Sequence, residues 1–321
     1  MPMSSYPNGF ANGLSVRGMP ITLAHPGKVF FLNNSSVLPE NGKGGSDSNN
    51  GSYLQPFSTL VGAVGKCKAS RGDIIMVMPG HAETISSATG CVLATAGVAI
   101  VGLGTGDLRP TFTLDTATTA IISVTAANVS FVNCLFVANF ADIAGCIKAG
   151  AKNLTIQDCE FRDTSSILNF AKLVTLSATT SNLCDGLTIE NCKWYGLGAT
   201  AASAVMGVTG TNNRWTVKNN YISHAATTGA ALCPISTGKV LTNFICDNNI
   251  FNLVGAQALA TGILITTDGT TNSGVICRNY IKSLDDTTEI LCTASSGFTF
   301  FENYYAGAAD KCGYLLPAAD A

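Results

Sequence analysis

Four acidic residues near the middle of the chain have the types and the spacing that acid–base chemistry requires. They are Asp158, Glu160, Asp163 and Glu190. Glycoside hydrolysis uses two carboxyl groups about 5 to 10 Å apart, one as acid and the other as base or nucleophile. Asp158 and Glu160 are two residues apart, so in a strand both side chains would point to one side. Single acids on strands and turns are mostly solvated surface residues, and we expect that role here.

A histidine supplies one further acid–base pair. The segment Pro79-Gly-His-Ala-Glu-Thr84 places His81 two residues before Glu83. An imidazole next to a carboxylate can move protons near neutral pH. A Pro-Gly pair, however, most simply turns the chain between two strands. We therefore favour a structural role for His81 and Glu83 and expect no catalytic residues.

Metal sites are not expected either. The chain has 12 cysteines but no Cys-x-x-Cys, and a thiolate site needs ligands that converge on one point. The segment Asp47-Ser-Asn-Asn-Gly51 is similar to the start of a calcium loop, but the twelfth position is Ser58, where an acidic residue is required. We expect no metal and no cofactor, and we expect the thiols to be free and buried in a protein assembled in a reducing cytoplasm.

The elements that carry these residues follow from an internal repeat. Segments of the form Leu154-Thr-Ile-Gln-Asp-Cys-Glu-Phe161 begin at positions 129, 154, 187, 215, 244, 274 and 298, with a degenerate copy at 98. The spacing of these starts varies from 24 to 33 residues. A period of this length is typical of a solenoid or another repeat array.

The pattern inside each octet indicates the kind of repeat. Positions one, three and eight are apolar almost throughout, which predicts strands with one buried face. Position five is mostly Asn or Asp, residues that tolerate the left-handed backbone of a turn. One strand-turn-strand unit per coil predicts an all-β parallel β-helix, in which like residues stack at about 4.8 Å per coil.

Position six supports this register. It is cysteine in three consecutive octets and asparagine in the next four: Cys134, Cys159, Cys192, Asn220, Asn249, Asn279 and Asn303. Cysteine fills a tight inward corner as a small apolar residue. Stacked asparagine amides can hydrogen-bond to one another along the column. We therefore predict a structural ladder along the inside of the solenoid.

The flanking segments complete the predicted organisation. Residues 1–28 are rich in proline and Asn-Gly pairs, which predicts an extended N-terminal arm. Residues 29–73 should hold a first strand, a loop and a short helix capped by Ser58, and this helix would cover the open end of the stack. The coils should fill residues 74–305. Residues 306–321 should form a C-terminal cap and tail, closed by Leu315, Leu316 and Pro317.

Composition excludes several classes of partner. Charged residues are 12% of the chain, about half the usual share, and the net charge is −2 without a basic cluster, which argues against nucleic-acid binding. No apolar run is long enough to span a membrane, and residues 1–23 lack the pattern of a secretory signal. So few charges indicate either outer surfaces covered by other chains or a neutral, hydrated surface of small residues.

Several segments resemble a known family. Pro56-Phe-Ser-Thr-Leu60, Gly72-Asp-Ile-Ile-Met-Val-Met-Pro-Gly80 and Gly102-Leu-Gly-Thr-Gly106 look like the start of right-handed β-helix proteins of the pectate-lyase-like superfamily. Tyr6-Pro-Asn-Gly-Phe10 and His25-Pro-Gly-Lys-Val-Phe30, with most of the chain, resemble β-helix virion proteins of tailed bacteriophages. The resemblance implies a right-handed parallel β-helix and a structural role in the virion. The Asn-Thr-Asp, Gly-His-Gly and Arg-Ile-Lys motifs of polygalacturonase-like enzymes are absent.

The function expected from this resemblance is capsid decoration or cementing, with the major capsid protein as partner and assembly in the host cytoplasm. We also expect a homo-oligomer, with a trimer suggested by similar virion proteins. The apolar arm is the expected binding segment, with anchoring residues Tyr6, Phe10, Leu14, Val16, Arg17 and Ile21. The alternative is a tail fibre or spike protein that binds or cleaves host glycan, with an outer stripe of Tyr195, Tyr221, Tyr280 and Tyr304.

Overall fold

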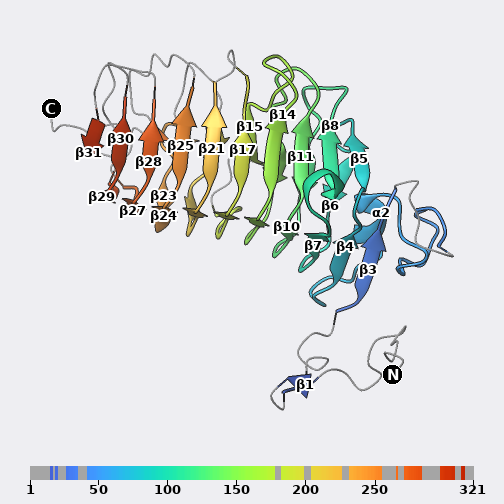
Figure 1. Ribbon diagram of the computed structural model, residues 1–321. Coiled ribbons are helices and arrows are strands. Elements are labelled where there is room, and N and C mark those ends of the chain that lie inside the picture. The colour runs from blue at the N-terminus through green and yellow to red at the C-terminus, as the bar shows by residue number, and fades with distance from the viewer. Residues whose placement is uncertain are drawn as a thin grey trace.

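The computed structural model describes residues 15–16, 19–20, 27–34, 42–177, 182–198, 204–225, 231–254, 265–266, 271–283, 297–307 and 312–314. The chain winds into stacked coils, and neighbouring strands in the stack come from successive coils (Figure 1). Two sheets contain ten strands each and a third contains five. The predicted all-β parallel β-helix is confirmed.

The first long sheet is parallel throughout. Its strands, in spatial order, are β3 (Val29–Leu32), β4 (Ile74–Val77), β7 (Ala99–Gly102), β10 (Ser130–Val132), β13 (Thr155–Gln157), β16 (Thr188–Glu190), β20 (Thr216–Lys218), β24 (Phe244–Asp247), β27 (Gly274–Cys277) and β29 (Thr299–Phe301). With about 4.8 Å between strands, the stack is about 43 Å long.

The second long sheet is parallel except for its last strand. Its strands are β5 (Ala82–Ile85), β8 (Thr111–Leu114), β11 (Leu135–Ala138), β14 (Glu160–Asp163), β17 (Lys193–Tyr195), β21 (Tyr221–His224), β25 (Ile250–Leu253), β28 (Tyr280–Lys282), β30 (Tyr304–Ala306) and the antiparallel β31 (Cys312–Tyr314). The third sheet contains β6 (Cys91–Leu93), β9 (Ile122–Val124), β12 (Ile147–Ala149), β15 (Lys172–Leu176) and β18 (Ala204–Met206).

Smaller elements complete the described residues. Three two-stranded pairs are β1 (Ser15–Val16) with β2 (Met19–Pro20), β19 (Asn212–Asn213) with β23 (Leu241–Thr242), and β22 (Cys233–Pro234) with β26 (Ile265–Thr266). The helices are α2 (Leu60–Val64) and the short η1 (Gly106–Leu108). Neither helix is long enough to span a membrane.

Each octet forms the corner between the two long sheets. Its first half ends a strand of the first sheet, position five turns, and its second half begins a strand of the second sheet. The position-five residues from Asn133 to Glu302 all have φ between 50° and 56°. Arg278 and Glu302 adopt this left-handed backbone although neither is Asn, Asp or Gly. The fold therefore sets this backbone conformation at position five, and Asn and Asp are the residues that adopt it at least cost.

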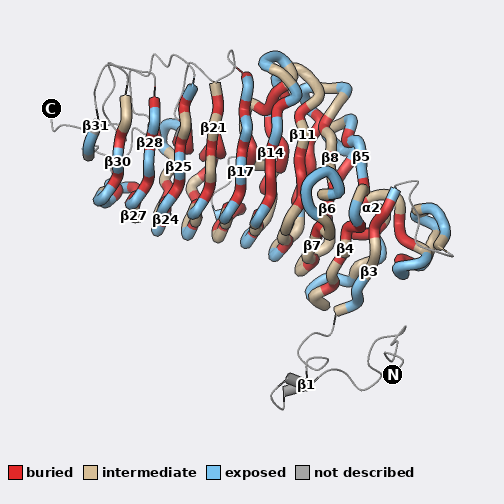
Figure 2. Tube along the Cα trace, in the orientation of Figure 1, coloured by how far each residue is buried: buried red, intermediate tan, exposed pale blue. Residues whose placement is uncertain are grey.

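The inward residues of the coils form one continuous core (Figure 2). Phe112, Phe136 and Phe161 occupy the same position in three successive coils. Their ring centroids are 5.8 and 5.1 Å apart, with the rings nearly parallel. Trp194 continues this column in the next coil and is fully buried. Like side chains stacked at the coil spacing thus hold the register through aromatic packing.

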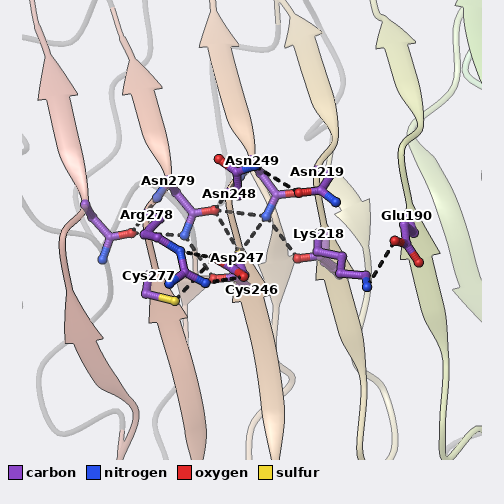
Figure 3. A network of polar contacts seen from close by, with 12 residues as sticks. Glu190, Lys218, Asn219, Cys246, Asp247, Asn248, Asn249, Cys277, Arg278 and Asn279 are labelled. Carbon is purple, nitrogen blue, oxygen red and sulfur yellow. Dashed lines mark hydrogen bonds and ion pairs between the residues drawn. The ribbon is translucent and has the colours of Figure 1, made fainter.

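The predicted asparagine ladder is present (Figure 3). Asn220, Asn249 and Asn279 each donate from Nδ2 to Oδ1 of the asparagine in the next coil, all at 2.9 Å and ending at Asn303. Each Oδ1 also accepts from the backbone N–H of the preceding ladder residue, at 2.8 to 3.1 Å, beginning with Cys192. The Nδ2 of each of the four asparagines also donates to a backbone carbonyl of the preceding coil. Both amide protons of Asn220, Asn249 and Asn279 are therefore paired inside the core.

The N-terminal end of the stack is closed by two segments. Helix α2 packs against β3 and β6 and buries Leu60, Ala63 and Val64. The free edge of β3 is paired by a loop, in which Phe57 donates to and accepts from the strand backbone. The predicted cap Ser58 is wrong, because Thr59 is the N-cap and accepts from the Gly62 N–H at 3.0 Å. At the other end β31 covers β30, whereas Leu315, Leu316 and Pro317 lie outside the described residues.

Replacing Asn249 by alanine should destabilise the protein by about 3 kcal/mol or more, because it leaves the buried Asn220 N–H without its acceptor and removes one hydrogen bond from each of the Asn220 and Asn279 amides. Asn252→Ala is a matched control in the same coil, since the half-buried Asn252 donates only to Ser223 Oγ at 3.2 Å. Urea unfolding measures both. Equal losses for the two variants would contradict a special role for the ladder.

Candidate functional site

His81 and Glu83 come together, but in the interior of the protein. His81 Nε2 lies 3.3 Å from Glu83 Oε2, and both side chains are buried. His81 Nδ1 accepts from the Asn34 N–H at 3.1 Å, so the ring proton is assigned to Nε2 and directed at Glu83. Glu83 Oε2 also accepts from the Leu60 N–H at 2.9 Å, at the start of α2. The pair joins strand β5 to the helix that closes the stack.

Glu160 is held between two arginines on the outer side of β14. Its Oε2 accepts from Arg109 at 3.0 Å, and its Oε1 accepts from Arg162. Asp158 occupies the left-handed turn position of the same octet, with φ of 53°. The two acids that share a side in the sequence pattern therefore lie in different environments. Glu160 is a paired carboxylate rather than a general acid or base.

Asp163, like Glu160, is buried, but its partners are backbone N–H groups. Its Oδ1 accepts from the Phe170 N–H at 3.0 Å, and its Oδ2 accepts from the N–H groups of Leu197 and Gly198 at 2.8 and 3.3 Å. Burial raises its pKa to about 6, although these three hydrogen bonds favour the charged form. A single carboxylate thus fixes the loops that follow β14 and β17.

His224 lies further along the same inward column of the second sheet. Its ring packs on Trp194, with centroids 5.4 Å apart. Burial lowers the pKa of His224 to about 4, so the ring is neutral at pH 7. Sequence reasoning named Asp163 as a candidate acid but missed that Asp163 and His224 are both buried. The available signal was the strand alternation, because Asp163 follows the inward Phe161 by two residues and His224 follows the inward Ile222 by two.

Charged residues on the outer corner alternate in sign from coil to coil (Figure 3). Lys218 Nζ lies 3.0 Å from Glu190 Oε1 in the preceding coil. Arg278 binds Asp247 with two hydrogen bonds, of 2.8 and 2.6 Å, again across one coil step. Each pair joins adjacent coils of the first sheet. The fourth candidate acid, Glu190, is therefore also part of a structural ion pair.

In the Arg71-Gly72-Asp73 segment, the carboxylate of Asp73 is buried. Asp73 accepts from the backbone N–H groups of Lys28 and Lys68, both at 2.7 Å, and binds Arg71 at 2.6 Å. Burial would raise the pKa of Asp73, but the hydrogen bonds from Arg71, Lys68 and Lys28 hold it at about 2. Gly72 has φ of 78°, in the left-handed region that glycine adopts most readily. The tripeptide is a structural turn.

In the Asp47–Gly51 loop, which is similar to the start of a calcium site, the carboxylate of Asp47 binds groups of the protein itself. Asp47 Oδ1 accepts from Ser58 and Thr59 N–H groups at 3.0 Å and from Ser58 Oγ at 2.9 Å, and its Oδ2 accepts from Thr59 Oγ1 at 2.7 Å. This carboxylate fixes the start of α2. In the described ranges, no group of three His, Cys, Asp or Glu side chains is placed to hold a metal ion.

Nine cysteines whose side chains the structure describes are free thiols, and all of these except the half-buried Cys67 are buried. Cys134, Cys159 and Cys192 form one column, as predicted from position six. Elsewhere in the core, burial raises the pKa of the Cys91 and Cys146 thiols, which keeps them protonated and unreactive.

The outer tyrosine stripe forms as the octet register predicts. Tyr221, Tyr280 and Tyr304 belong to one column of the second sheet, and Ile250 lies between the first two. Ile250, Tyr280 and Tyr304 are 44–45% exposed. Tyr195 is outside this column, because it pairs with Ser223, but its ring centroid is 5.8 Å from that of Tyr221. Sequence reasoning missed Ile250, although it occupies the same octet position.

The expected anchoring residues fall mostly outside the described part of the chain. Tyr6, Phe10, Leu14, Arg17 and Ile21 all lie there. Val16 belongs to β1 and pairs through its backbone with Met19 of β2. The pair β1–β2 forms a sheet of its own, hydrogen-bonded to none of the solenoid strands that the structure describes. The role of these six residues stays a prediction.

Comparisons with known proteins give a fold likeness and no family. No family model matches the chain, and no curated protein matches it. Among solved structures, the chain is similar to one named rhamnogalacturonan lyase, with 14% identity, a TM-score of 0.43 and 90% of each chain covered. At that identity and TM-score the likeness assigns no activity to this protein.

The two buried titratable groups predict opposite pH dependences. The pKa of Asp163 is raised from 3.8 to about 6, so its contribution to stability is full below pH 4 and is lost as pH rises to 6. The pKa of His224 is lowered from 6.5 to about 4, so its contribution is full above pH 6.5 and is lost as pH falls to 4. Each amounts to about 3 kcal/mol, and between pH 4 and 6 they should nearly cancel.

Single substitutions separate the two effects. Relative to the unmodified chain, Asp163→Asn should lose stability on acidification from pH 6.5 to 4, and His224→Gln should gain it over the same range. Urea unfolding midpoints measured across this range test both. Parallel pH profiles for all three proteins would show that neither group titrates in the folded state as described.

Proposed function

We propose that this protein is a non-catalytic structural component of a virion, a capsid decoration or cement protein that binds the assembled coat lattice. The observation that carries the non-catalytic part is the use of the candidate acid–base groups. Glu83, Glu160, Asp163 and Glu190 each have a structural partner in the fold. The virion part is supported by the resemblance of the sequence to β-helix virion proteins.

The N-terminal arm is the proposed attachment segment. The pairing of β1 only with β2 supports this role, because the arm strands extend neither long sheet of the solenoid. A proline-rich segment with regularly placed apolar residues can order along a neighbouring protein. Binding to assembled coat subunits and not to free ones stabilises the lattice by mass action. The proposed partner is the major capsid protein.

The chemistry of the chain suits this assembly route. Free cysteines, with no disulfide among the nine whose side chains the structure describes, fit folding in a reducing host cytoplasm. A charged fraction of 12% and the exposed apolar side chains of the outer coils favour further contacts between protein chains, including a homo-oligomer such as a trimer. The virion is the proposed final location.

Glycan cleavage by a tail protein is the competing function. It requires two carboxyl groups, or a carboxylate cluster with a base, open to a bound sugar chain. Of the four acids named from the sequence, Glu160 and Glu190 are ion-paired and Asp163 is buried, whereas Asp158 is exposed at its turn position. Cleavage therefore has no observation in its favour, whereas glycan binding without cleavage is a separate question.

Deleting residues 2–24 should leave the coils folded and abolish binding to the lattice. The solenoid strands do not pair with β1 or β2, so the circular dichroism spectrum and the melting temperature should change little. Cosedimentation with empty capsids measures binding, and the full chain should saturate at a fixed ratio to coat subunits.

A chain without residues 318–321, which lie beyond the predicted C-terminal cap, is the control truncation and should bind as the full chain does. Unchanged binding after the N-terminal deletion would show that the arm is not the anchor. Binding of the full chain to isolated tails and not to capsids would overturn the decoration function itself.

A further inference from the structure

One outer face of the solenoid differs from the rest in composition. It is formed by the outward side chains of β17, β21, β25, β28 and β30, and we call it the tyrosine face: Lys193, Tyr195, Tyr221, Ser223, Ile250, Asn252, Tyr280, Lys282, Tyr304 and Ala306. Four of these ten are tyrosines, and the described Tyr195, Tyr280 and Tyr304 are 41–45% exposed. The outward residues of the preceding strands β5, β8 and β11 are mostly small or β-branched.

The charged side chains that these five strands contribute to the face are positive. None of its five strands contains an aspartate or glutamate, and Lys193 and Lys282 are both exposed. In the coil before Lys193, the carboxylate of Glu160 is already bound by Arg109 and Arg162. The two lysines are three coil steps apart, about 14 Å along the axis. A ligand that lies along these five strands therefore meets two separated positive charges and no carboxylate from the strands themselves.

The face is also rigid before any ligand binds. The inward partners of its side chains, from Trp194 to Tyr305, are buried in the core. The neutral polar groups are ordered, since Asn252 donates to Ser223 Oγ at 3.2 Å. Tyrosine offers an apolar ring and a hydroxyl on the same side chain, which suits the C–H faces and hydroxyl groups of sugar rings. A preorganised surface loses little conformational entropy on binding.

We propose that the tyrosine face binds an extended, sparsely anionic polysaccharide that lies along the solenoid axis. Nucleic acid is disfavoured, because two lysines over this length neutralise too few phosphates. A second copy of the same face would place lysine against lysine. A peptide strand would need a free sheet edge, but β17, β21, β25 and β28 are paired on both sides, and β31 pairs with the outer edge of β30. Binding here is independent of the arm and of lattice attachment.

The direct test uses the full chain and hyaluronan, which carries a carboxylate on alternate sugars. Affinity is measured by electrophoresis through gels that contain the polysaccharide. Tyr280→Ala with Tyr304→Ala should weaken binding about tenfold or more. Phe301→Ala is the matched control, because Phe301 is 44% exposed in the same last coil but belongs to the other long sheet, β29. Equal affinity of the double variant and the unmodified chain would overturn the proposal.

A second pair of substitutions tests the charge and avoids the tyrosines. Lys193→Gln with Lys282→Gln should weaken hyaluronan binding and make the remaining binding less sensitive to salt. Dextran, which is neutral, should bind more weakly than hyaluronan to the unmodified chain. Equal binding of dextran, or tighter binding of single-stranded oligothymidine than of hyaluronan, would each contradict a sparsely anionic polysaccharide as the ligand.

Discussion

In-register stacking of the coils is the constraint on which every other feature depends. A slip of one residue would turn each inward side chain outward, so the register must be fixed strongly. The two halves of the solenoid do this differently. Stacked aromatic rings, Phe112, Phe136 and Phe161, act in the first half. In the second half, amides from Asn220 to Asn303 act, each donating to and accepting from its neighbours.

The stacked coils also determine how the carboxylates of the chain are used. The carboxylates that could have formed a catalytic centre fix a helix start, two loops and several coil steps. Glu83 and Asp163 are buried, and Glu190 is half-buried in its ion pair with Lys218. What remains for recognition is the outer surface of paired strands, which is flat, rigid and differentiated mainly by side-chain type.

Much of this structure could be predicted from the octets alone. They contain the strand ends, the left-handed turn at position five and the residue that stacks at position six, so the long sheets, the ladder and the tyrosine column followed. The third sheet did not, because segments such as Ile147–Ala149 and Lys172–Leu176 share no common pattern. The burial of Asp163 depends on backbone donors from the following coil, at Leu197 and Gly198, which no local pattern reveals.

The hydrogen bonds between coils run along the solenoid axis, and this direction has a mechanical consequence. A force that pulls the two ends apart along the axis loads the coil-to-coil contacts in series, so coils should peel away one at a time from an end. A force across the axis, along the strands, must shear the bonds of a coil together. The protein should therefore resist sideways stress on a surface far better than tension along its own length.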